Sequence, residues 1–385
     1  MIQWNEGGQH YSAKWHSENG IAPHQKIQLA DDTLTADIAY RLACEGTAML
    51  YKGDFQNARQ LLQALVRRVD KPSKKSARAD RVVKEKTKSP LDSFNLYRLA
   101  QSQRARILGM VLIPINADHS ISLRRAPDVA IACLEAYGEQ AEPYVISLRE
   151  LLGVISAHEW RKKGVPVLAR DDEEIRIHPH YGVFSPIRGE YIELVLKAPL
   201  PAIVLENSIA FDIGVGTGVL SVVLAMREIK KIIGTDQDDR AIRCATENIE
   251  RLGLSTQIEI LKTNLFPKEK AALIVCNPPW LPARPSSSLE HAVYDYESQM
   301  LKGFLENLKD HLIPGGEGWL ILSDLAEHLG LRTREELLAW IDAAGLKVIT
   351  HIDTKPQHQK VFDKTNALHA ARSKEITSLW RLQVK

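Results

Sequence analysis

The chain has 385 residues, of which 44% are hydrophobic and 25% are charged, and its formal net charge is +2. This composition excludes a disordered or fibrous protein, and the length is enough for two domains of about 100–200 residues each. The near-neutral balance means that any affinity for nucleic acid has to come from a local patch. The chain does not open with a basic stretch and an apolar run, and no segment reaches the roughly 18 apolar residues of a membrane span. We therefore expect a cytoplasmic protein that does not contact a membrane.

The first half of the chain shows the spacing of helices. Apolar residues recur at helical intervals in four segments, which are 32–69, Leu91–Leu112, Ala126–Tyr137 and Pro143–Lys163. Convincing strand alternation is absent from this half. We therefore predict a mainly helical substrate-recognition domain over residues 1–168.

A strongly basic segment interrupts these helices at residues 67–88. Its cations are Arg67, Arg68, Lys71, Lys74, Lys75, Arg78, Arg81, Lys84, Lys86 and Lys88. Clustered cations can bind the phosphates of a nucleic acid, because they release its counterions. The same composition is equally typical of a solvated connector, and the sequence leaves the two interpretations open.

In the second half, strands alternate with helices. Two short strands at Val165–Leu168 and Ile175–Ile177 lead into this pattern. Longer strands are predicted at Ile203–Asp212, Ile232–Asp236, Ile258–Lys262, Ala272–Cys276, Gly318–Ser323, Leu346–His351 and Ser378–Val384, and helices at Gly218–Arg227, Asp239–Leu252, Gln299–His311 and Thr333–Ala344. This order predicts an α/β domain over residues 169–385, with a doubly wound, Rossmann-like sheet of seven strands.

A glycine-rich loop follows the first long strand and contains Asp212, Gly214, Gly216 and Gly218. Glycines let a ligand approach bare backbone, and the start of the next helix supplies free amides. A dinucleotide dehydrogenase would need glycine at position 219, where the chain has Val219, so hydride transfer is disfavoured. The Asp212 carboxylate would repel a pyrophosphate and suits a cationic amino group better.

The second long strand ends at Asp236, which Gln237 follows. At this place a carboxylate can accept hydrogen bonds from both hydroxyls of a ribose. Asp212 and Asp236 could each serve only as a cap of a turn or helix. Together with the glycines, however, they favour a nucleoside ligand that carries an amino-acid part.

The fourth long strand ends in Asn277, Pro278, Pro279 and Trp280. The two prolines stiffen the loop and remove two amide donors, so the loop presents carbonyl groups. The side-chain oxygen of Asn277 and the carbonyl of Pro278 can both accept from one planar amino group, and Trp280 offers a face to the attached π system. We therefore predict these four residues to be catalytic toward an sp² nitrogen.

These motifs, in this order and spacing, resemble the class I methyltransferases of the "small domain" group, which includes release-factor glutamine and ribosomal RNA guanine methyltransferases. The resemblance covers roughly residues 180–350 and implies S-adenosylmethionine as the cofactor. Residue by residue it implies cofactor contacts at Asp212, Gly214, Gly216, Gly218, Asp236, Gln237, Asn264, Leu265 and Asn277. It also implies a segment that closes over the site, with Tyr181, Phe184, Arg188 and Glu190. The chain departs from the family pattern at two places: Asn264 replaces the usual aspartate, and the amino-acid sequence of residues 181–191 differs from the signature of the glutamine enzymes.

No metal site is expected. Cys44, Cys133, Cys244 and Cys276 form no CxxC pair, and His178-Pro179-His180 has no companion residues at ligand spacing. The predicted function is S-adenosylmethionine-dependent methylation of a planar exocyclic amino nitrogen, with a base of RNA or DNA as the leading substrate. Two alternatives stay open: methylation of a glutamine amide in a protein partner, and a cofactor-binding, nucleic-acid-associated factor without catalysis.

Overall fold

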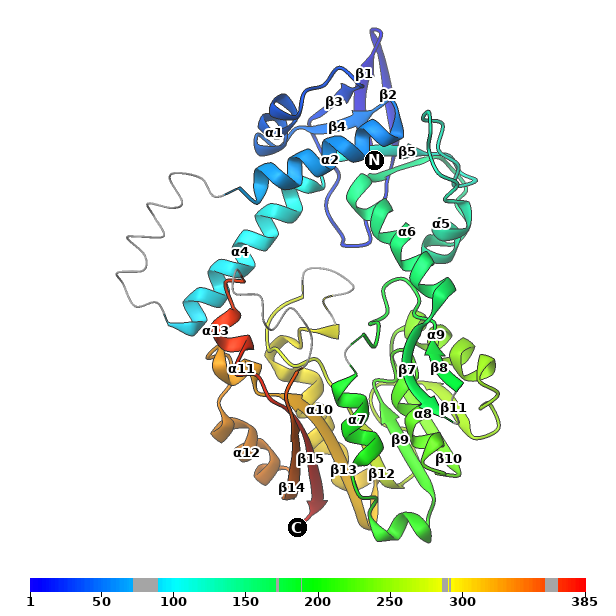
Figure 1. Cartoon of the computed structure of the whole chain (residues 1–385), viewed down its shortest axis with the longest axis vertical. Coiled ribbons are helices and arrows are strands. Elements are labelled where there is room, and N and C mark those ends of the chain that lie inside the picture. Colours follow the sequence, from blue (N-terminus) through cyan, green and yellow to red (C-terminus); the bar gives the residue numbers. More distant parts are fainter. Residues whose placement is uncertain (72–88, 171–172, 188, 286–289, 291, 357–365) are drawn as a thin grey trace. The chain divides into compact units, whose positions relative to one another are not determined.

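The computed structural model describes residues 1–71, 89–170, 173–187, 189–285, 290, 292–356 and 366–385 (Figure 1). The chain divides into two compact units, Met1–Glu159 and Trp160–Lys385. Within the described residues, no helix combines the length and the apolar character that crossing a membrane requires.

The N-terminal unit is built on a six-stranded mixed sheet in the order β1-β2-β6-β5-β4-β3. Its strands are β1 (Ile2–Glu6), β2 (Gln9–Trp15), β3 (Ile27–Ala30), β4 (Ala48–Tyr51), β5 (Val111–Ile115) and β6 (Tyr144–Ser147). Its helices are α1 (Ala36–Cys44), α2 (Phe55–Val69), α4 (Pro90–Leu108), α5 (Ala130–Tyr137) and α6 (Leu148–Lys163), the last of which continues into the second unit. Side chains cap several of these helices, as Asp54 does for α2 and Ser89 for α4.

The sheet of this unit corrects the prediction for the first half of the chain. The predicted helices are present, but strands β4 and β6 lie inside segments predicted to be helical, and the first two residues of β5 overlap another such segment. All four residues of β4 are buried, and four of the five residues of β5 are too. A strand buried on both faces has no polar alternation, so a short apolar run of this kind cannot be told from part of a helix.

The C-terminal unit has a seven-stranded sheet in the order β11-β10-β9-β12-β13-β15-β14. Its strands are β9 (Ile209–Ile213), β10 (Lys231–Asp236), β11 (Ile258–Lys262), β12 (Ala271–Cys276), β13 (Leu312–Ser323), β14 (Leu346–Thr354) and β15 (Thr377–Val384). The helices that accompany them are α7 (Glu190–Lys197), which precedes β9, and α8 (Val219–Met226), α9 (Asp239–Arg251), α10 (Gln299–His311), α11 (Leu325–His328), α12 (Arg334–Ala343) and α13 (His369–Arg372). A separate hairpin of β7 (Val165–Arg170) and β8 (Glu173–Ile177) precedes them.

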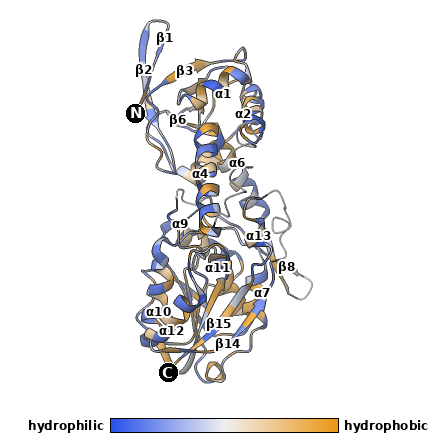
Figure 2. Ribbon diagram, turned by 90° about the vertical axis from the view of Figure 1, so that its left-hand side faces the viewer, coloured by the Kyte–Doolittle hydropathy of each residue, from blue (hydrophilic) through white to orange (hydrophobic). Residues whose placement is uncertain are grey.

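Helices cover both faces of this sheet. Residues of α7, α8 and α9 share one apolar cluster with the sheet, and residues of α10 and α12 share a second. Figure 2 shows hydrophobic residues along β15, whereas α9 carries hydrophilic residues on its outer side. The predicted doubly wound sheet of seven strands is confirmed, with β15 antiparallel to both of its neighbours. One strand is shorter than predicted, because Ala202–Leu205 form a 3-10 helix ahead of β9.

Candidate active site

Three loops meet at one edge of the C-terminal sheet. Strands β10, β9 and β12 are neighbours and run parallel, so the residues that follow them lie at the same edge. The amides of Gly214 and Val215 both donate to the carbonyl of Thr235, over 2.9 and 2.8 Å. The predicted glycine loop therefore lies directly beside the end of β10, where Asp236 is located.

The backbone of the glycine loop suits a ligand that lies against it. Gly214, Gly216 and Gly218 have φ values of +77°, +53° and +84°, a region that other residues rarely adopt. A methyl group added at Gly214 would lie 2.6 Å from Cε of Met300. At Gly216 it would meet nothing nearer than the Gly214 carbonyl oxygen at 3.9 Å, so this part of the loop is open to a ligand.

Asp212 is buried below this loop, with 1% of its surface exposed. Its Oδ2 accepts hydrogen bonds from the amide and the hydroxyl of Ser221, over 2.8 and 2.7 Å. Burial raises the pKa of the carboxyl to about 7. The Ser221 hydrogen bonds oppose this rise, and the charge of Asp236 contributes to it. A cationic group would favour the ionised form of Asp212.

Asp236 is held by backbone donors on both carboxylate oxygens. Oδ2 accepts from the Gly216 amide over 3.2 Å, and Oδ1 accepts from the Asp238 amide over 3.0 Å. Burial raises the pKa of Asp236, and these hydrogen bonds oppose the rise. Carboxylate oxygens have further lone pairs, so the fixed side chain can still accept from ribose hydroxyls. Gln237, the next residue, is exposed.

Glu190, at the start of α7, supplies a second carboxylate whose charge, like that of Asp212, acts on Tyr191. Among the described residues, the buried Oε1 of Glu190 has no hydrogen-bond partner. Both carboxylates lie close enough to Tyr191 for their charges to raise the pKa of its hydroxyl beyond the larger effect of burial. An ammonium group would satisfy Glu190 and offset the burial of Asp212. These residues therefore fit the amino-acid part of S-adenosylmethionine.

The loop after β11 contains Asn264 and Leu265. Asn264 is exposed, and Leu265 has a left-handed φ of 62°. The hydroxyl of Thr235 donates to the Leu265 carbonyl over 2.5 Å and links this loop to the end of β10. The sequence alone does not predict this role for Thr235, because threonine is common in buried strands.

The acceptor loop, defined as residues 277–280, follows the fully buried strand β12. The indole N–H of Trp280 donates to Oδ1 of Asn277 over 2.9 Å. The ring of Trp280 also packs against both apolar clusters of the unit. The indole thus fixes the Asn277 carboxamide, a role additional to the stacking surface predicted from sequence. Since a carbonyl oxygen has two lone pairs, Oδ1 can accept one further hydrogen bond.

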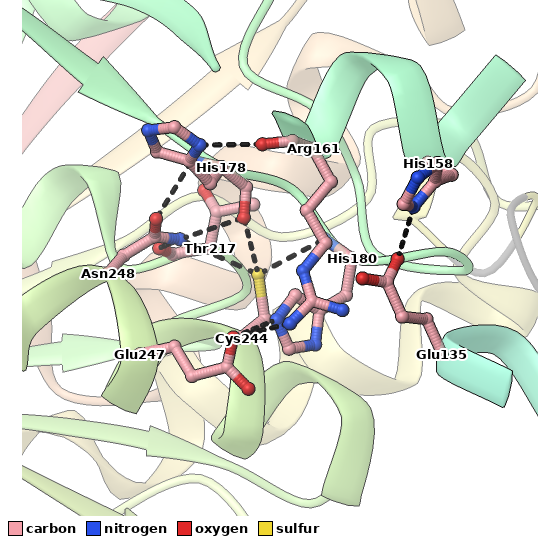
Figure 3. A network of polar contacts seen from close by, with 9 residues as sticks. All are labelled: Glu135, His158, Arg161, His178, His180, Thr217, Cys244, Glu247 and Asn248. Carbon is pink, nitrogen blue, oxygen red and sulfur yellow. Dashed lines mark hydrogen bonds and ion pairs between the residues drawn. The ribbon is translucent and has the colours of Figure 1, made fainter. Parts of the chain in front are cut away.

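The segment predicted to close over the site is anchored through His178 and His180 (Figure 3). The side chain of Asn248 accepts from the His178 amide over 2.8 Å and donates to the His178 and Thr217 carbonyls over 3.3 and 3.1 Å. Nε2 of His180 lies 2.8 Å from Oε2 of Glu247. Asn248 therefore joins this segment to the glycine loop. No group of metal-binding side chains occurs among the residues that the structure describes.

The remaining residues of this segment lie in different surroundings. Tyr181 is half-buried with its ring 6.0 Å from the Arg240 guanidinium, and Phe184 is exposed. Arg188 lies outside the described residues. The sequence analysis does not identify Asn248 as a site residue. A pattern in the sequence could have indicated it, because Asn248 lies on the buried stripe of α9 formed by Ala241, Cys244, Ala245 and Ile249. An amide on an apolar stripe indicates a specific buried partner.

Comparison with known proteins agrees with this geometry. Residues 193–279 match the family model of ribosomal protein L11 methyltransferase (PrmA). A putative protein N5-glutamine methyltransferase of Methanocaldococcus jannaschii is 27% identical over 161 residues, which are 40% of this chain and 78% of that protein. The release factor glutamine methyltransferase of Geobacter sulfurreducens is 30% identical over 168 residues, 40% of this chain and 54% of that protein. A U6 small nuclear RNA (adenine-(43)-N(6))-methyltransferase of Caenorhabditis elegans is 32% identical over 88 residues, 20% of this chain and 18% of that protein.

The C-terminal unit is a class I S-adenosylmethionine-dependent methyltransferase domain. S-adenosylmethionine is the cofactor of this family. The matched residues of the family model end at Pro279, so they include the glycine loop, Asp236 and most of the acceptor loop. The relatives act on both protein and RNA according to their names, and the methyltransferase domain by itself leaves the substrate open.

Proposed function

We propose that the chain methylates an exocyclic amino nitrogen on a base of RNA or DNA. The observation that carries this proposal is the Asn277 carboxamide, which Trp280 holds at the end of β12 beside the glycine loop. With Oδ1 of Asn277 and the carbonyl of Pro278, the loop offers two acceptors to one planar NH₂ group. This is the acceptor type of the "small domain" methyltransferases that the sequence resembles.

The chemistry requires little from the protein beyond position. The lone pair of the amino nitrogen forms a bond to the methyl carbon, the carbon–sulfur bond breaks with its electrons going to sulfur, and the nitrogen then loses a proton to solvent. S-adenosylmethionine supplies the electrophilic methyl group on its sulfonium. Hydrogen bonds from both N–H groups to carbonyl oxygens raise the electron density on a nitrogen whose lone pair is delocalised, and they fix its direction of attack.

Charge along the chain supports a nucleic acid as the substrate. Residues 67–88 contain ten Lys or Arg and three Asp or Glu. Most of this segment lies outside the described residues; of its first residues, Arg68 pairs with Asp37 over 2.9 Å. A segment with this surplus of cations can release counterions from a phosphate backbone. The RNA methyltransferase among the relatives is consistent with such a target.

A glutamine amide in a protein is the second candidate. It is also a planar NH₂ group, and two relatives are named as glutamine methyltransferases. The amino-acid sequence of residues 181–191 differs from the signature of those enzymes, and this difference favours the nucleic-acid substrate. A cofactor-binding factor without catalysis is a further alternative, and an Asn277→Ala variant that retained its full biological effect would support it.

Calorimetric titration with S-adenosylmethionine, S-adenosylhomocysteine and NADH is the first test. We expect binding of the two adenosyl compounds only, and loss of this binding in Asp236→Ala. Transfer of a labelled methyl group to separate RNA, DNA and protein fractions then identifies the substrate. Label in RNA or DNA that disappears in Asn277→Ala supports the proposal. Label confined to protein would replace it with the glutamine alternative.

A further inference from the structure

An exposed aromatic side chain lies on the segment that pairs with the chain after the acceptor loop. Tyr296, in the short 3-10 helix Tyr296–Ser298 ahead of α10, has 39% of its surface exposed. Backbone hydrogen bonds tie this segment to the residue after the acceptor loop: the Leu281 amide donates to the Val293 carbonyl over 3.1 Å, and the Asp295 amide donates to the Leu281 carbonyl over 2.9 Å. The segment that carries Tyr296 is therefore paired with the chain directly after the acceptor loop.

The turn that carries Tyr296 has an unusual backbone that is held by hydrogen bonds. Glu297 and Ser298 both have left-handed φ values, 57° and 56°, although neither is glycine. Such conformations persist only where the surroundings fix them, and they concentrate at functional sites. Here the Asp295 carboxylate accepts from the Met300 and Leu301 amides over 3.0 and 3.1 Å and holds the turn to the start of α10.

A guanidinium group adds to this surface. The Cζ atom of Arg284, also exposed, lies 4.7 Å from the centre of the Tyr296 ring. Unpaired bases of nucleic acids stack on aromatic rings and on the flat face of arginine. An exposed ring on a turn held by hydrogen bonds needs little ordering when a base binds, so more of the stacking energy appears as affinity.

We propose that Tyr296 and Arg284 form a stacking platform for an unpaired base of the nucleic-acid substrate, next to the base that is methylated. This inference rests on the proposed function and adds a contact that sets substrate preference. It commits the substrate to single-stranded or locally unpaired nucleic acid, because a base inside a duplex has both of its faces covered.

The test measures binding of the full chain, with S-adenosylhomocysteine present, to fluorescent single-stranded RNA and DNA of about 12 nucleotides and mixed sequence, which contain the exocyclic amino groups of adenine, cytosine and guanine. We expect Tyr296→Ala to weaken binding by roughly 5- to 150-fold and Tyr296→Phe to bind like the unaltered protein. The salt dependence should not change in Tyr296→Ala, because no phosphate contact is lost. Leu338→Ala is the control, since Leu338 is similarly exposed at 43% and lies on α12, which carries no predicted site residue.

The outcomes separate this inference from the proposed function. If the unaltered chain binds neither oligonucleotide, the nucleic-acid substrate itself fails. If it binds and Tyr296→Ala binds equally well, only the platform is overturned. A loss of affinity shared by Tyr296→Phe also overturns the platform, because the phenylalanine ring still stacks. Stronger binding of one oligonucleotide distinguishes RNA from DNA as the source of the base.

Discussion

The buried carboxyl of Asp212 makes the stability of the methyltransferase domain depend on pH. Burial raises its pKa from 3.8 to about 7 in the folded chain. Because this pKa is higher in the folded than in the unfolded chain, protonated Asp212 contributes its full share to the free energy of unfolding below about pH 4. This contribution is lost as the pH rises through about 7. Asp212→Asn stays neutral, so we expect it to gain stability relative to the unaltered protein between about pH 5 and 8, by up to a few kcal/mol. Urea unfolding without cofactor measures this, and a difference independent of pH would contradict it.

Cofactor binding should follow the opposite trend with pH. An ammonium group beside Asp212 and Glu190 favours the ionised Asp212 carboxyl, so binding below its pKa has to release a proton. We expect the affinity for S-adenosylhomocysteine to fall by up to tenfold for each pH unit below about 7. Calorimetry at several pH values tests this, with Asp212→Asn as the control that should bind more weakly and with little pH dependence. Affinity that stays constant from about pH 5 to 8 would show that Asp212 does not face the ligand.

Trp280 is expected to act through Asn277. Trp280→Phe removes the N–H that donates to Oδ1 of Asn277 but keeps an aromatic ring against the apolar clusters. Since one such hydrogen bond contributes about 0.5–1.5 kcal/mol, we expect kcat to fall roughly 2- to 13-fold. Methyl-transfer kinetics measure this on the substrate found by the labelling screen. Trp340→Phe, a similar change away from Asn277, should leave kcat intact.

At the scale of elements, helix α9 supports the cofactor loop through Asn248. This side chain is 1% exposed and bonds both the Thr217 carbonyl and the backbone of His178. Asn248→Asp would place a carboxylate oxygen against the two carbonyl oxygens to which the Asn248 amide now donates. The two carbonyls would lose their donor, and a charge would be buried beside them. We expect a loss of about 2–5 kcal/mol in unfolding free energy and weaker binding of S-adenosylhomocysteine. Glu250→Gln, an exposed change on the same helix, should alter neither, and an unaffected Asn248→Asp would remove Asn248 from this role.

The helices and strands differ in how well the sequence alone predicts their bounds. In the C-terminal unit, helix α10 has the predicted bounds, because its apolar residues recur at helical spacing between polar ones. In the N-terminal unit, strand β4 escaped prediction since Ala48–Tyr51 are all buried and adjoin a helix on each side. Local pattern alone cannot separate such a strand from a helix, and only the pairing of β4 with β3 and β5 distinguishes them.

The candidate site could be predicted only in part, for a reason that belongs to the whole fold. Asp212, Asp236 and Asn277 each end a predicted parallel strand, and neighbouring parallel strands bring such ends together. The approach of Tyr191 on α7 to Asp212 depends instead on how α7 packs on the sheet, which no sequence spacing encodes. The link from Trp280 to Asn277 likewise depends on side-chain geometry within the loop.

The whole chain is expected to divide into parts that fold separately. The buried residues of both apolar clusters in the C-terminal unit begin at Ile177, and the part-buried residues packed against them begin at Val167, so this core does not require the first 159 residues. A fragment from Ala157 to Lys385 keeps the last part of α6, including Arg161, whose carbonyl lies 2.6 Å from Nδ1 of His178. We expect this fragment to unfold cooperatively and to bind S-adenosylhomocysteine within about threefold of the full chain, while losing affinity for the substrate. Calorimetry and thermal unfolding of both proteins test this. An unfolded fragment would show that the C-terminal unit needs the N-terminal unit to fold, and a folded fragment that does not bind the cofactor would show that the N-terminal unit is needed for cofactor binding.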